Sequence, residues 1–232
     1  MTSRWPSPRW TTSPRVAREL QLQLAAQVRV TPLPGDVRWV AGLDATVSPN
    51  GRWMIGVATL WDLQEHCVAE VRSAWLRMRF PYVPGLLSFR EAPVLLAALR
   101  KLRKKPDLLL CDGQGLAHPR RFGLACHLGV LCDLPSVGSA KNRLVGEATE
   151  PGPAPGAWEP LLDQGEVVGA VVRTRPGCKP VYVSVGHRCT LEDAVRLVLA
   201  CCQGHRLPEP THRSDRTARL VRRLLPARRL AS

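Results

Sequence analysis

The stretch DLLLCDGQG, residues 107–115, is a short apolar run that ends on an aspartate and a glycine. A continuous apolar run of this kind is typical of a strand buried on both faces, as in a parallel sheet, and the glycines indicate the turn that follows it. Residues 88–102 carry apolar side chains at helical spacing. Residues 118–134 predict a second helix and 135–141 a short strand. This alternation of helices and strands indicates an α/β fold.

Three strand-like runs precede this region, at residues 38–47, 52–62 and 66–78. Asn50-Gly51 between the first two is a strong signal for a two-residue hairpin, and a three-residue link suits a second hairpin. Together with the later elements, they predict a mixed sheet, in which three antiparallel strands are followed by parallel strands, flanked by helices.

The chain is expected to form one domain over residues 14–215. Residues 1–13 are rich in Pro, Ser, Arg and Trp and predict a disordered tail, and Ser13-Pro14 then favours a helix start. Residues 146–160 are expected to be a surface loop. Residues 216–232 form a basic tail, and from residue 213 onward seven arginines stand against one aspartate. This tail either adds affinity for a nucleic-acid backbone or is disordered.

The 232 residues carry a formal charge of +14 with a pI near 10.3, which favours a polyanionic partner. Nucleic acid leads, with an anionic membrane surface as the second possibility. Neither a membrane-spanning apolar run nor a secretory signal is visible, so a soluble, cytoplasmic protein is expected. The eight cysteines show no CxxC or zinc-type spacing, which indicates reduced core residues.

Two aspartates stand at the ends of apolar strands, where α/β sheets gather ligands. Asp44 follows VAGL and Asp112 follows LLLC. If these strands are neighbours, the carboxylates converge and suit Mg²⁺ or Mn²⁺. Glu91 would add a third carboxylate, but Ser88-x-x-Glu91 also matches a helix-capping box. Lys141 is a candidate for offsetting charge on a phosphoryl group.

Other polar residues divide into candidates and expected structural residues. His118 and Arg120 follow the Asp112-Gly113 turn, where they could bind phosphates. His127 lies in an apolar helical pattern and is expected in the core, and Asp62 and Asp133 are expected to be turn residues.

The stretch FPYVPGLLSFRE, residues 80–91, places an aromatic side chain between two prolines. Pro81 and Pro84 restrict the backbone on both sides of Tyr82. On spacing alone, this is either a stiff loop that presents the ring to a ligand or a tight turn with an incidental aromatic.

Several motifs together resemble endonuclease V: VAGLDAT, PYVPGLLSFRE, PDLLLCDGQGLAHPRRFGLACHLGV, LPSVGSAK, YVSVGHR and RLPEPT, in order over about residues 15–215. The resemblance implies a ribonuclease H-like fold and a metal-dependent endonuclease for deaminated purines, chiefly inosine, in DNA repair. It implies hydrolysis of the second phosphodiester bond 3′ to the lesion, leaving 3′-hydroxyl and 5′-phosphate ends. The implied cofactor is Mg²⁺, with Mn²⁺ as a substitute.

The resemblance also implies roles for individual residues. The metal ligands would be Asp44, Glu91, Asp112 and Asp215, and Lys141 would act near the scissile phosphate. Tyr82 would be the wedge beside the lesion, with the following residues shaping its loop and the base pocket: Pro81, Val83, Pro84, Gly85, Leu87 and Gly113.

Two positions depart from the family pattern. Asn142 stands where relatives often have a second lysine, and His212-Arg213 stand where relatives commonly have an arginine and an apolar residue, which could alter the geometry around Asp215. The expected partner is inosine-containing DNA, bound by a monomer. Two alternatives stay open: an inosine-directed ribonuclease that acts on RNA, and a basic nucleic-acid binder without catalysis.

Overall fold

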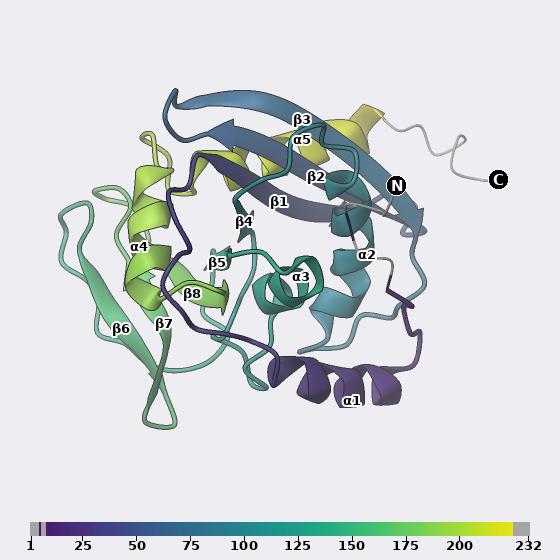
Figure 1. Ribbon diagram of the computed structural model, residues 1–232, viewed down its shortest axis with the longest axis horizontal. Coiled ribbons are helices and arrows are strands. Elements are labelled where there is room, and N and C mark those ends of the chain that lie inside the picture. Colours follow the sequence, from purple (N-terminus) through teal and green to yellow (C-terminus); the bar gives the residue numbers. More distant parts are fainter. Residues whose placement is uncertain (1–4, 6–7, 225–232) are drawn as a thin grey trace.

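The computed structural model describes residue 5 and residues 8–224 and has an α/β fold built on one mixed sheet (Figure 1). In chain order the elements are α1 (Pro14–Ala25), β1 (Trp39–Val47), β2 (Trp53–Asp62), β3 (Cys67–Arg77), α2 (Leu87–Leu99), β4 (Leu108–Cys111), α3 (Leu124–Cys132), β5 (Ser136–Ala140), β6 (Trp158–Asp163), β7 (Glu166–Val172), β8 (Val181–His187), α4 (Leu191–Ala200) and α5 (Glu209–Leu224). Within residues 8–224, no helix has the length and apolar character that a membrane span requires.

The sheet contains eight strands in the order β3-β2-β1-β4-β5-β8-β7-β6. The first three strands in the chain form antiparallel hairpins, as the sequence predicts. Their links are longer than expected, because they span residues 48–52 rather than two residues and 63–66 rather than three. Strands β4 and β5 then continue parallel to β1. The sheet returns to antiparallel pairing at β8, β7 and β6, so its parallel part is confined to three central strands.

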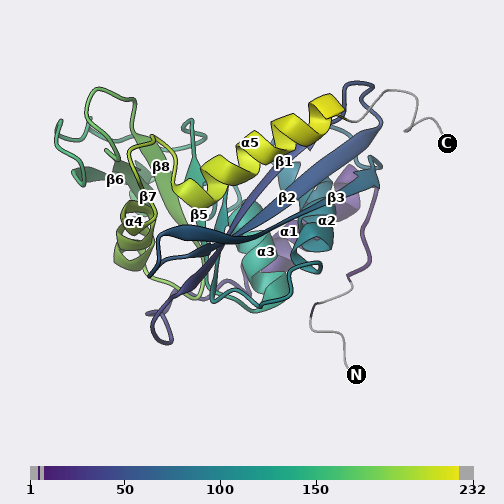
Figure 2. The same ribbon diagram turned by 90° about the horizontal axis from the view of Figure 1, so that it is seen from above.

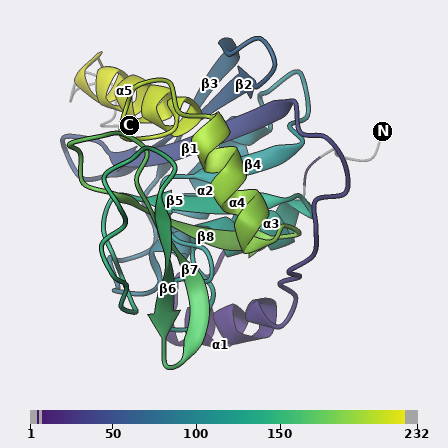
Figure 3. The same ribbon diagram turned by 90° about the vertical axis from the view of Figure 1, so that its left-hand side faces the viewer.

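Helices cover both faces of the sheet. Successive side chains of β1 point to opposite faces, so the strand contributes to a separate apolar core on each face. Ala41 and Leu43 pack in the cluster formed with α2 and α3, whereas Val40 belongs to the cluster that contains α4. Figure 2 shows α5 lying along β1 and β2, which it contacts directly. Helix α1 packs against α3, and Figure 3 shows α1 and α5 at opposite ends of the molecule.

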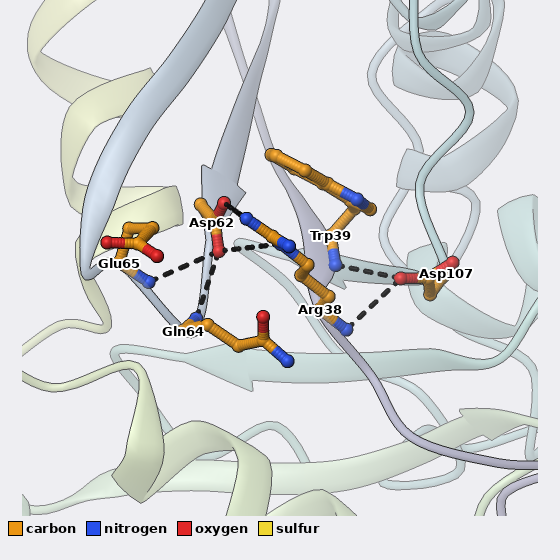
Figure 4. Close-up of polar contacts among 6 residues, drawn as sticks. All are labelled: Arg38, Trp39, Asp62, Gln64, Glu65 and Asp107. Carbon is orange, nitrogen blue, oxygen red and sulfur yellow. Dashed lines mark hydrogen bonds and ion pairs between the residues drawn. The ribbon is translucent and has the colours of Figure 1, made fainter.

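The parallel register of β1 and β4 is fixed at the start of both strands by Asp107 (Figure 4). Its carboxylate accepts hydrogen bonds from the backbone N–H groups of Arg38 and Trp39, at 3.1 and 2.8 Å. The Asp107 N–H in turn donates to the Trp39 carbonyl at 2.8 Å. The pairing then runs from Val40↔Leu108 to Leu43↔Cys111, so the next residues, Asp44 within β1 and Asp112 just after β4, are also neighbours.

Asp62 and Asp133 are turn residues, as predicted. Asp62 ends β2, accepts the N–H groups of Gln64 and Glu65, and pairs with Arg38 at 2.7 Å (Figure 4). Asp133 caps α3 in the left-handed conformation, with φ of 47°. His127 is buried in the core, as expected.

The structure differs from the sequence expectations at α5 and β6. Helix α5 extends from Glu209 to Leu224, so the predicted domain end at residue 215 falls inside it, and residues 225–232 lie outside the described part. Its buried face consists largely of small or polar residues, which give no apolar helical pattern. The expected loop at 146–160 already contains the start of β6.

The predicted N-terminal tail and second helix also differ in part. Within the first 13 residues, Trp5 is buried and Trp10 packs against the core, so the described tail residues contact the fold. Helix α3 begins at Leu124 rather than near residue 118. A Cβ atom at Gly123 would lie 2.2 Å from the Gln114 carbonyl oxygen, which shows how closely the loop before α3 is packed.

Helix α5 is held against β1 and β2 by close backbone contact and two buried hydrogen bonds. A Cβ atom at Gly42 would lie 2.1 Å from the carbonyl carbon of Pro210, so this position has room for glycine alone. One turn further along, the Ser214 hydroxyl bonds to the Gly42 carbonyl and the Thr59 hydroxyl, both at 2.8 Å. These contacts set the position of the next residue, Asp215.

Replacing Gly42 with alanine should push α5 away from the sheet. Overpacking of a filled core typically costs about 1–3 kcal/mol, and we expect the Gly42→Ala variant to lose at least that much free energy of unfolding in denaturant titrations. Gly35→Ala is the matched control, because a Cβ atom there meets nothing within 4 Å. Equal stability of the two variants would contradict this packing account.

Candidate active site

Three carboxylates meet on the α5 face of the sheet. Asp44 follows Leu43 on β1, and the Asp112 N–H donates to the Leu43 carbonyl at 2.9 Å, which makes the two aspartates neighbours on adjacent strands. Asp215 descends from α5 above them. Oxygens of the three side chains lie within 4.8 Å of one another. The predicted convergence of Asp44 and Asp112 is therefore confirmed, and α5 supplies the third carboxylate.

The three carboxylates form an oxygen-rich site suited to a hard divalent cation. The Asp112 and Asp215 side chains are only 11% and 16% exposed. Burial raises the pKa of Asp44 to about 7, and the charge of Asp112 adds to the shift. Burial also raises the pKa of Asp112, although Lys141 acts against this shift. A bound cation would remove the repulsion that these carboxylates impose on one another.

Lys141 follows β5, next to β4, and partly neutralises the cluster. Its ammonium group donates to Asp112 at 2.7 Å and lies 3.6 Å from Asp215. Burial acts to lower the Lys141 pKa, but the neighbouring carboxylates outweigh it and leave the pKa raised. The Arg206 guanidinium donates to the Lys141 carbonyl at 2.6 Å and so holds the backbone at this position. Lys141 is therefore a charged group fixed beside the carboxylates.

Glu91 lies in the first turns of α2 and faces the same cluster from the other side of the sheet. Burial raises its pKa to about 8, and the charges of Asp44 and Asp112 add to the shift. It stands outside the group of three whose oxygens lie within 4.8 Å. The capping box is absent, since α2 begins at Leu87 and the Ser88 hydroxyl contacts His127 Nδ1 at 3.1 Å.

The segment before α2 presents Tyr82 to solvent. Tyr82 is 70% exposed, and the Arg90 guanidinium lies 5.7 Å from its ring centre. Pro81 and Pro84 on either side are also exposed, whereas Val83 packs against a small buried cluster around Phe80. Of the other predicted pocket residues, Leu87 is exposed at the start of α2 and Gly113 follows β4 beside Asp112.

This loop is anchored through one main-chain oxygen, the carbonyl of Gly85. It accepts hydrogen bonds from Gln21 Nε2 at 3.0 Å, His118 Nε2 at 3.1 Å and Arg120 Nη2 at 2.6 Å. The Arg120 N–H donates to His118 Nδ1, so the ring proton resides on Nε2. Burial, followed by the charge of Arg120, lowers the His118 pKa to about 4, so the ring is neutral.

His118 and Arg120, which are predicted to contact phosphate, use polar side-chain atoms for hydrogen bonds within the protein. Both ring nitrogens of His118 are used within the protein, and the ring is buried. Arg120 donates from Nε to Gln21 and from Nη2 to Gly85. These side chains act in the structure as anchors of the loop that carries Tyr82, and their contact with phosphate stays a prediction.

The sequence reasoning missed Gln21, the third donor. Its side chain is 0% exposed, and the amide also donates to the Phe122 carbonyl at 2.8 Å. Gln21 lies one turn after the buried Ala17 on the inner face of α1. The available signal was therefore a glutamine on the apolar stripe of an amphipathic helix, because a buried amide needs fixed partners.

The two departures from the family pattern lie beside the site. The Asn142 side chain is exposed, and its carbonyl accepts a hydrogen bond from Gln114 at 2.9 Å. The His212 ring stacks on His205 with 4.1 Å between centres. Among the described residues, no hydrogen bond joins His212 to Asp215.

Removing the Gln21 amide should loosen the Tyr82 loop. The Gln21→Leu variant leaves the Phe122 carbonyl and the Arg120 Nε–H without the partner that Gln21 provides. Leaving a buried polar group unpaired typically costs about 1–3 kcal/mol of stability. We expect this loss in denaturant titrations, together with faster amide exchange across residues 82–86. Gln23→Leu on the exposed face of α1 is the control. Equal effects of the two changes would contradict the anchoring role.

Comparison with known proteins agrees with this arrangement. The family model of endonuclease V matches residues 22–216. The endonuclease V of Roseiflexus sp. (strain RS-1) is 51% identical over 209 residues, which are 90% of this chain and 93% of the relative.

Two solved structures have the same fold. The crystal structure of endonuclease V from Streptomyces avermitilis superposes with a TM-score of 0.87 at 42% identity, covering 91% of this chain and 94% of that one. The Ciona intestinalis enzyme, in complex with a 24mer DNA containing an inosine followed by a ribo-adenosine, gives a TM-score of 0.79 at 26% identity, covering 90% and 98%. The sequence match and the carboxylate site lead to one conclusion: this chain belongs to the endonuclease V family and is a nuclease with its ribonuclease H-like fold.

Proposed function

We propose that the protein is a metal-dependent endonuclease of DNA repair that recognises deoxyinosine in DNA. It would hydrolyse the second phosphodiester bond 3′ to the lesion and leave 3′-hydroxyl and 5′-phosphate ends. The observation that carries this proposal is the convergence of Asp44, Asp112 and Asp215 beside Lys141. The DNA complex of the Ciona relative supports the substrate, and the formal charge of +14 suits a polyanion.

The carboxylates are proposed as ligands for Mg²⁺, with Mn²⁺ as a substitute. When bound, the metal supplies a deprotonated water and stabilises the leaving 3′-oxygen. The aspartates Asp44, Asp112 and Asp215 hold it through their oxygens, and Glu91 approaches them from the other face of the sheet. Lys141 is fixed within reach of the cluster and can balance negative charge on the scissile phosphate.

Lesion recognition is assigned to the loop before α2. A base inside a duplex becomes accessible only after unstacking, which costs a few kcal/mol and costs least at a mismatched or damaged pair. The exposed Tyr82 ring is a candidate wedge for the vacated space. The backbone of Gly85, Leu87 and Gly113 would line the pocket for the displaced base.

RNA is the second candidate substrate. The DNA bound by the Ciona relative carries a ribo-adenosine after the inosine, so a 2′-hydroxyl is accommodated next to the lesion in that protein. An inosine-directed ribonuclease would use the same carboxylates and the same loop.

Cleavage assays with matched substrates test the proposal. With Mg²⁺, the protein should cut an inosine-containing duplex at the second bond 3′ to the lesion, leave an undamaged duplex intact, and lose activity with EDTA. Substituting a residue that hydrogen-bonds to a metal ligand commonly lowers metal affinity or activity 10–100-fold. Asp112→Asn changes a proposed ligand itself, so it should lower the cutting rate by more than about 100-fold. The exposed Glu192→Gln on α4 is the control and should cut normally.

Three outcomes would decide against parts of this proposal. Equal cutting of damaged and undamaged duplexes would remove the lesion specificity. Faster cutting of a matched inosine-containing RNA would favour the ribonuclease. Binding without any metal-dependent cutting would favour a non-catalytic binder.

The wedge role of Tyr82 has its own test. Tyr82→Ala should lower the ratio of cutting rates between inosine-containing and undamaged duplexes, because nothing would then fill the vacated space. Metal affinity, measured by calorimetry, should stay within about twofold, since the ring lies beside Arg90 and, among the described residues, forms no hydrogen bond with Asp44, Asp112 or Asp215. Tyr82→Phe keeps the ring and should keep the discrimination. Unchanged discrimination in Tyr82→Ala would refute the wedge.

A further inference from the structure

Helix α5 continues beyond the last catalytic candidate as a strongly basic segment. From Arg216 to Leu224 it has four arginines and no acidic residue. The match to the family model ends at residue 216, so residues 217–224 lie outside it. Arg216, Arg219, Arg222 and Arg223 all have exposed side chains and are here called the arginine track.

The track is continuous with the carboxylate site. One open cleft of about 580 Å³ is lined by Asp44, Lys141 and Asp215 together with Arg219, Arg222 and Arg223. A second hollow of about 480 Å³ lies along the same helix and includes Arg216, Arg219 and Arg223. The arginines therefore line a surface that leads directly away from the carboxylates.

The charges on the track are mostly without partners inside the protein. Arg219 pairs with Asp215 at 3.1 Å. Within residues 8–224, Arg216, Arg222 and Arg223 form no ion pair with a carboxylate. Cations near a helix C-terminus stabilise the helix dipole, but this effect is confined to the last turn and does not explain Arg216 or Arg219. Several guanidinium groups on neighbouring turns repel one another unless an anion lies between them.

The length of α5 from Asp215 to Arg223 matches the length of about three phosphates along one nucleic-acid strand. With a rise of 1.5 Å per residue, Arg223 lies about 12 Å along the axis from Asp215. One DNA strand advances 3.4 Å per phosphate along its axis, so about three phosphates span the same distance. Guanidinium groups suit phosphate because they offer a planar, bidentate set of donors.

We infer that the arginine track binds the phosphate backbone of the substrate strand within about three nucleotides of the cut, as an extension of the active site. This inference rests on the proposed function for the location of the cut. The track supplies affinity and positioning without reading bases, because phosphate contacts carry no sequence information.

The test uses the triple variant R216Q/R222Q/R223Q of the full chain and leaves Arg219 in place because it contacts Asp215. The control triple variant, R15Q/R29Q/R196Q, removes the same charge from side chains that are 79%, 58% and 69% exposed on other elements. Binding to an inosine-containing duplex is measured over a range of salt concentrations, with D112N added to every protein so that the duplex stays intact.

We expect the track variant to reduce the slope of log affinity against log salt by about 2 to 3, since each phosphate contact contributes about 0.9. The control variant should change it by less than 1. A single methylphosphonate removes one phosphate charge from the DNA. Placed near the cut, it should weaken binding of the protein whose arginine track is intact. In the track variant, the same substitution should cause no further loss.

Equal slopes for the two triple variants would overturn the inference. It would also be overturned if the track variant lost binding only to anionic phospholipid vesicles and kept the DNA slope. Failure of the proposed function would look different, because the protein without substitutions would then not cut the inosine-containing duplex, whatever the salt slopes.

Discussion

The parallel pairing of β1 with β4 is the constraint on which the site depends. It places Asp44 beside Asp112, where burial disfavours the charged form of both carboxylates and their charges repel one another. The pairing is fixed at its far end by Asp107 and flanked by apolar cores on both faces of the sheet. Apolar burial, at roughly 25 cal/mol per Å², can offset such a local electrostatic cost. The cluster is thus an unfavourable arrangement maintained by a favourable fold.

The parts of the fold that follow from backbone periodicity could be predicted from the sequence. The run before Asp112 is apolar at every position because that strand is covered on both faces. Turn chemistry at Asn50-Gly51 predicts the hairpin of β1 and β2, but not the length of its link, which spans residues 48–52. The convergence of Asp44 and Asp112 required only that their strands be neighbours. The assignment of Glu91, by contrast, depended on family resemblance, because its spacing from Ser88 equally fits a cap that the structure does not form.

The rest escaped prediction because its contacts are specific to the tertiary structure. Helix α5 docks through Ser214 and a glycine on the facing strand, and neither produces a hydrophobic period. Gln21 joins segments separated by 64 residues or more, and its side-chain nitrogen donates to main-chain carbonyl oxygens, which every residue carries. A sequence identifies which side chains are apolar, but it does not identify which main-chain atoms need a donor.

The anchoring of the Tyr82 loop at a main-chain oxygen has a consequence for how such enzymes can diverge. The three donors contact the Gly85 carbonyl and no side chain of residues 81–84. Position 85 is constrained, because its φ of 75° and its contact with Arg120 exclude a larger residue, and Val83 is held by packing against the cluster around Phe80. The loop's location therefore does not depend on the chemical character of the exposed Tyr82 side chain. Selection could change what the tip reads, one residue at a time, while the loop stays where it is.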